Sequence, residues 1–143
     1  MRKNIKNMVF MFQKEVADRI IAKPNSKAYS SLSVFTSYIF DIIKVKDISG
    51  ANFWPNANVI STILKFVPKE KRVFKGEKEQ QFFKFLRHAF RQKRKTLKNN
   101  LQDIDDISNI LSQAGLINTS RAEELTLDKF KELFNIIDEK HTF

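Results

Sequence analysis

The sequence predicts a mixed fold that is α/β in its first half and all-helical (all-α) after about residue 77. A short apolar run, Met8–Phe12, is followed directly by apolar residues at helical spacing. Two later segments, Tyr38–Val45 and Val59–Val67, are rich in the Ile, Val and Phe that strands favour. Beyond Glu77 the apolar residues recur at helical spacing, and three Gly and three Pro are too few for a turn-rich all-β barrel.

The first half is predicted to run strand, helix, helix, strand, strand, an order typical of α/β folds. Met8–Phe12 is apolar at every position, as expected of a strand buried on both faces of a parallel sheet. A helix is expected over Lys14–Ile21, ended by Pro24, and a second short helix over Leu32–Phe35. The loop Asp47–Asn58 then separates the two later strands.

The second half is predicted to hold four helices. The first runs to about Leu101, and the next ends at Gly115, placed as its C-terminal cap. Ser120–Glu123 matches a capping box for a short third helix. Thr126 caps the fourth helix. The apolar face of that last helix comprises Leu127, Phe130, Leu133, Phe134 and Ile137.

The segment Lys84–Lys98 carries seven Lys or Arg and no acidic residue. On one continuous helix six of its cations would line a stripe beside an apolar stripe. Lys93 would fall on the apolar side, so either its side chain snorkels or the helix is not ideal. Such a face can hold a polyanion, of which nucleic acid is the commonest. The alternative is an ordinary solvated helix face, although the interleaved Glu of such faces is missing. The predicted RNA-binding residues are Lys84, Arg87, Arg91, Lys93, Arg94, Lys95 and Lys98.

Charge is distributed unevenly along the chain, whose net charge is +10. Residues 1–102 carry 22 Lys and Arg against 7 Asp and Glu, whereas residues 103–143 carry 4 against 9. This asymmetry indicates a directed basic surface and favours nucleic acid over an acidic small substrate.

The residues by themselves indicate no catalytic, cofactor or metal site. The chain has no Cys, and its three Gly are isolated, so neither a thiolate metal site nor a glycine-rich phosphate loop is expected. Asp103, Asp105 and Asp106 open a predicted helix, where acids favour the positive end of the helix dipole. No apolar run approaches the length of a membrane span.

Four strings, in order, resemble the small-subunit ribosomal RNA adenine dimethyltransferase family. Met11–Arg19 is similar to the family's last central strand and helix, and Ala22–Val34 to the loop and helix that follow. Ala89–Leu101 resembles the family's basic helix, and Arg121–Phe130 its closing helical signature. The resemblance covers only the C-terminal half of such an enzyme.

This resemblance implies the last strands and helices of a Rossmann-like methyltransferase sheet over residues 1–70 and a helical RNA-binding domain over 71–143. Pro68–Gly76 is the expected joint. The family binds S-adenosylmethionine and dimethylates adenines of small-subunit ribosomal RNA, but its donor-binding and catalytic motifs precede the matched region. This chain is therefore expected to hold no cofactor itself. The alternatives are a non-catalytic RNA-binding remnant or assembly factor, and an inert truncated product. A cytoplasmic location is implied.

The family loop that packs against the target base resembles Phe53–Ser61, with Ala57, Asn58 and Ile60 replacing the family's Pro, Lys and Asp. By resemblance Phe53 stacks on the flipped adenine. The alternative, a loop aromatic that plugs the core, is equally compatible with the sequence. Because the family strands that would pair with Met8–Phe12 are absent here, a homodimer through that exposed strand is also expected.

Overall fold

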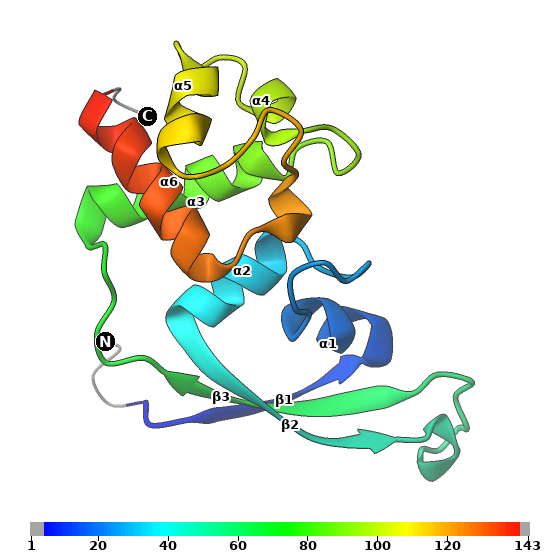
Figure 1. Cartoon of the computed structure of the whole chain (residues 1–143). Coiled ribbons are helices and arrows are strands. Elements are labelled where there is room, and N and C mark those ends of the chain that lie inside the picture. The colour runs from blue at the N-terminus through cyan, green and yellow to red at the C-terminus, as the bar shows by residue number, and fades with distance from the viewer. Residues whose placement is uncertain (1–4, 141–143) are drawn as a thin grey trace.

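A three-stranded antiparallel sheet forms the base of the molecule (Figure 1). The computed structural model describes residues 5–140. β3 (Ser61–Pro68) lies between β1 (Met8–Gln13) and β2 (Phe40–Ile48), and both pairings are antiparallel. β2 and β3 form a hairpin whose long loop carries a 3₁₀ turn, Gly50–Asn52. The mixed α/β character is confirmed. Met8–Phe12 is a strand as predicted, but its expected burial on both faces is wrong, since β1 is a largely exposed edge strand whose pairing with β3 is antiparallel.

Helices cover only one face of the sheet. Short α1 (Lys14–Ile20) buries Ala17 and Ile20 against Leu64 and Phe66 of β3. On the opposite face, in the described part of the chain, four apolar side chains remain about half exposed: Val9 (56%), Met11 (51%), Ile43 (53%) and Val45 (52%). The uninterrupted apolar sequence of β1 is typical of a strand whose sheet is covered by other elements on both faces. In the described residues only the face toward α1 is covered.

The second helix is longer than its sequence indicates. α2 extends over Ser31–Ile39, so Tyr38 and Ile39, predicted to open a strand, are helical. The Tyr38 hydroxyl accepts a hydrogen bond from the Phe74 N–H (2.9 Å) and donates one to the Phe74 carbonyl (3.2 Å). This anchoring of Tyr38 in the helical core outweighs the β propensity of the segment, so the strand begins at Phe40.

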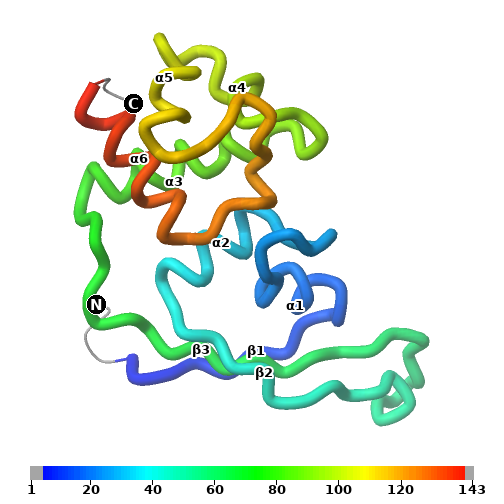
Figure 2. Tube along the Cα trace, in the orientation of Figure 1, coloured from blue at the N-terminus to red at the C-terminus, as the bar shows by residue number. Residues whose placement is uncertain are grey.

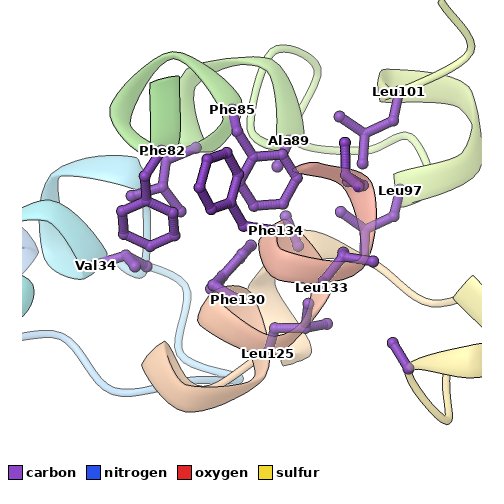
Figure 3. Packing of buried hydrophobic residues seen from close by; sticks show 14 of the residues in the cluster. Val34, Phe82, Phe85, Ala89, Leu97, Leu101, Leu125, Phe130, Leu133 and Phe134 are labelled. Atoms are coloured by element: carbon purple, nitrogen blue, oxygen red, sulfur yellow. The ribbon is translucent and has the colours of Figure 1, made fainter. Parts of the chain in front are cut away.

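The second half is helical, as predicted, and encloses a Phe-rich core. The helices are α3 (Gly76–Ala89), α4 (Leu97–Asn100), α5 (Ile107–Gln113), a 3₁₀ turn (Ala122–Glu124) and α6 (Leu127–Lys140). Figure 3 shows Phe82 and Phe85 of α3 directed toward Phe130 and Phe134 of α6. Ring centroids of Phe82 and Phe134 lie 5.3 Å apart, and those of Phe85 and Phe134 5.6 Å apart. All four rings are fully buried.

The helix ends follow the predicted caps in two cases of three. Gly115 has φ of +72°, the left-handed conformation that favours glycine. Thr126 accepts a hydrogen bond from the Lys129 N–H at 3.2 Å and thereby caps α6. The predicted box at Ser120–Glu123 is wrong by one residue, because Glu124 accepts from the Arg121 N–H instead.

Residues 5–140 contain neither a membrane-spanning helix nor a metal-binding cluster. Within that range no helix combines the length and apolarity needed to cross a membrane. The same residues bring together no group of three acidic, His or Cys side chains able to hold a metal ion.

Candidate nucleic-acid interface

The basic segment Lys84–Lys98 is not one helix, which corrects the prediction. α3 ends at Ala89, residues 90–96 form an irregular loop, and the single turn α4 begins at Leu97 (Figure 2). Lys84 and Arg87 therefore lie on α3, Lys98 lies on α4, and the remaining four cations lie on the loop between them. The single stripe of charges is replaced by a cationic turn, which we call the basic loop (residues 90–96).

All seven predicted RNA-binding side chains are exposed. Ion pairs of the described residues include Lys78 with Asp138 (2.7 Å) and Arg72 with Glu79. No carboxylate of those residues pairs with Arg87, Lys98 or any cation of the basic loop. Lys93 instead donates to the Lys27 carbonyl, so it leaves the apolar side by reaching the chain before α2. The uncompensated charge supports binding of a polyanion over an ordinary solvated face.

Asn100 holds the basic loop in shape. Its side chain is 6% exposed. Its Nδ2 donates to the carbonyls of Ala89 (2.8 Å) and Gln92 (3.1 Å), and its Oδ1 accepts from the Gln92 N–H (3.2 Å). The bond to Ala89 satisfies a carbonyl that the end of α3 leaves without a helical partner, and the two bonds to Gln92 hold the backbone of the basic loop. No sequence motif marks Asn100, and its only signal is a polar residue between the apolar Leu97 and Leu101.

We expect Asn100→Leu to lower the free energy of unfolding by about 1–3 kcal/mol, since the buried hydrogen bond to the Ala89 carbonyl and two partly buried bonds to the Gln92 backbone are lost. RNA affinity should fall as well, although no cation is removed, because the basic loop loses its fixed shape. Urea denaturation and RNA titration measure the two effects. Asn99→Leu, at an exposed neighbouring position, serves as the matched control. Unchanged RNA affinity in a folded Asn100→Leu protein would contradict this role.

The Phe53 loop lies at the tip of the β2–β3 hairpin, away from α3 and α4 (Figure 1). Phe53 is half-buried, so its ring is neither fully exposed nor fully buried in the core. Stacking on the target adenine and filling the core therefore both stay predictions. The adjoining Trp54 is 95% exposed, which no sequence pattern indicates. Gly50 fixes the loop: a Cβ there would lie 1.8 Å from the Ala57 carbonyl oxygen.

Two hollows lie in the described part of the chain. A hollow of about 350 Å³ beneath the hairpin loop is lined by small and apolar residues with Asn56 and Asn58. A groove of about 200 Å³ lies between α2 and α3. Neither is lined by a carboxylate for the donor's ribose, and Gly50, Gly76 and Gly115 stand alone in the sequence.

Comparison with known families gives one match that covers almost the whole chain. The sequence model described as ribosomal RNA adenine dimethylase matches residues 1–139. Ribosomal RNA small subunit methyltransferase A of Phytoplasma australiense is 38% identical over 136 residues, which are 90% of this chain and 48% of that protein. The protein of the same name from a Wolbachia strain of Culex pipiens is 43% identical, over 92% of this chain and 50% of its own length. The chain spans about half the length of these relatives.

Solved structures show the same likeness in the fold. The dimethyladenosine transferase of Plasmodium falciparum superposes with a TM-score of 0.79 at 24% identity, covering 98% of this chain and 60% of that chain. The 23S rRNA methyltransferase ErmE gives a TM-score of 0.69 at 17% identity, covering 95% of this chain and 56% of that chain. At these identities the structures support the fold alone.

Proposed function

Since this chain belongs to the ribosomal RNA adenine dimethylase family, we propose that it is the C-terminal, RNA-binding part of an S-adenosylmethionine-dependent enzyme that dimethylates adenines of small-subunit ribosomal RNA. The observation that carries the RNA-binding role is the basic loop, whose exposed cations have no carboxylate partner within residues 5–140. In this proposal Lys84, Arg87, Arg91, Lys93, Arg94, Lys95 and Lys98 contact phosphates.

In this proposal the chain consists of two units. Residues 1–70 form the end of a Rossmann-like sheet, and residues 71–143 form the helical RNA-binding domain. Two separate hydrophobic clusters support this division, one between α1 and the sheet and one among the helices. α2 joins the units, because Val34 and Tyr38, from the first unit, are buried in the helical cluster. Phe53 on the hairpin loop is the proposed stacking partner of the target adenine.

A second polypeptide segment completes the sheet in this proposal. The bare sheet face exposes Val9, Met11, Ile43 and Val45, and β1 is an edge strand. Exposed apolar surface on an edge strand is normally covered in stable proteins. The relatives are about twice as long as the matched region, so in them a further segment is long enough to form a donor-binding half. In this proposal that half packs against the exposed sheet face and the β1 edge. In its absence we expect self-association through Met8–Phe12, and a monomer by light scattering at micromolar concentration would contradict this.

The test is calorimetric titration of the chain with S-adenosylmethionine and, separately, with small-subunit ribosomal RNA. We expect salt-dependent binding of the RNA and no binding of the donor. Adding the first half of a relative, and measuring methyl incorporation into the RNA, then separates the two candidate roles. Incorporation supports the enzyme part, whereas RNA binding without incorporation favours the non-catalytic remnant or assembly factor. A chain that binds neither RNA nor donor would contradict the proposal.

A further inference from the structure

The groove between α2 and α3 combines an aromatic floor with an exposed cation. Its volume is about 200 Å³. The residues that line it are Ser31, Leu32, Phe35, Phe83, Leu86 and Arg87. Those from α3 lie three and four positions apart, so one face of that helix forms one wall, and Leu32 and Phe35 of α2 form the other.

The aromatic pair in this groove is held firmly but remains accessible. Ring centroids of Phe35 and Phe83 lie 4.4 Å apart at 54°. Phe83 is fixed from behind by an edge contact with Tyr38, with centroids 5.6 Å apart. Phe35 is 36% exposed and Leu32 39% exposed. A flat ligand can therefore reach a preformed apolar surface without moving the core.

Arg87 connects this surface to the basic segment. Its side chain is exposed, and no carboxylate of residues 5–140 pairs with it. A guanidinium offers planar donors to a phosphate and stacks on flat rings. A ligand that fits must carry flat apolar rings beside negative charge. Single-stranded nucleic acid has this alternation, and its bases commonly stack on aromatic side chains.

We propose that the Phe35–Phe83 groove is a subsite for one unpaired nucleobase of the bound RNA, with Arg87 on the adjoining phosphate. This inference rests on the proposed RNA-binding role and adds to it a preference for unpaired over fully paired RNA. The basic loop supplies charge attraction to either form, whereas the groove accepts only a base that is free to leave its stack.

The probe is a short unstructured RNA that carries one 2-aminopurine, whose fluorescence is quenched on stacking, compared with a fully paired duplex. Phe35→Leu keeps the apolar volume but removes the ring face. We expect it to weaken single-strand binding roughly 5- to 100-fold. Duplex binding and the salt slope should be unchanged, because every cation that meets a phosphate is kept. Phe35→Tyr should bind as the unmodified protein does.

Ile117→Ala, at an apolar position 68% exposed and outside the groove, is the matched control, and thermal melting checks the fold of each variant. Equal loss of single-strand and duplex binding in Phe35→Leu, or no loss in either, would overturn the groove proposal while leaving the basic loop intact. Absence of any salt-dependent RNA binding by the unmodified chain would overturn both this inference and the proposed function.

Discussion

Replacing Arg91, Arg94 and Lys95 together with Gln is expected to weaken RNA binding on the order of 100-fold at 0.1 M salt. These three side chains project from the basic loop without carboxylate partners in residues 5–140. Each phosphate that is no longer neutralised reduces the slope of log affinity against log salt by about 0.7–0.9, so the triple variant should show a slope smaller by about 2–3.

Fluorescence anisotropy with labelled ribosomal RNA at several salt concentrations measures both quantities. The matched control replaces Lys46, Lys71 and Lys140 with Gln, which removes the same formal charge from exposed cations that no carboxylate of residues 5–140 pairs with and that lie outside the basic segment. If the two triple variants lose affinity equally, binding depends on net charge alone. The assignment of the interface to the basic loop would then be wrong.

The break in the basic segment shows where sequence reasoning failed. Helical periodicity predicted one helix through Lys98, but a continuous helix would place Arg87 against Arg91, and Arg91 against Lys95, at positions i and i+4. Like charges at that spacing destabilise a helix. Thr96, a favourable N-cap, was the local signal for a new helix start, and its hydroxyl accepts from the Asn99 N–H at 3.3 Å. The Asn100 side chain also stabilises the loop through its hydrogen bonds to Ala89 and Gln92. No hydrophobic periodicity in the sequence predicts these bonds.

An element could be predicted from the sequence where its hydrophobic periodicity matches the face that it buries in the structure. The face of α6 was predicted residue by residue because an amphipathic helix above one core needs a single apolar stripe. The segment at Tyr38 has strand-like composition yet is helical, because hydrogen bonds to Phe74, 36 residues away, hold it there. The candidate RNA-binding residues were predicted from the run of Lys and Arg, whereas the arrangement of four of them on a loop depends on contacts that the sequence pattern does not show.

We expect Phe134→Ala to lower the free energy of unfolding by about 3–5 kcal/mol, the usual cost of a buried Phe-sized cavity. Phe134 is fully buried, and its ring contacts Phe74 (centroids 5.1 Å apart) as well as Phe82 and Phe85 of α3. The surrounding rings are held by several elements and can close the cavity only in part. Urea denaturation measures the change. Val73→Ala, at a site 63% exposed, should change it by less than about 0.5 kcal/mol.

The same substitution couples stability to RNA binding. α3 carries Lys84 and Arg87 and leads into the basic loop, and it is Phe134 that packs α6 against the buried face of α3. A domain with a typical total stability of about 5–15 kcal/mol would lose a large fraction of it. RNA affinity should therefore fall in parallel with the folded fraction as temperature rises, and at low temperature it should return toward the unmodified value. A Phe134→Ala protein that is fully folded but does not bind RNA would show instead that α6 acts on the interface directly.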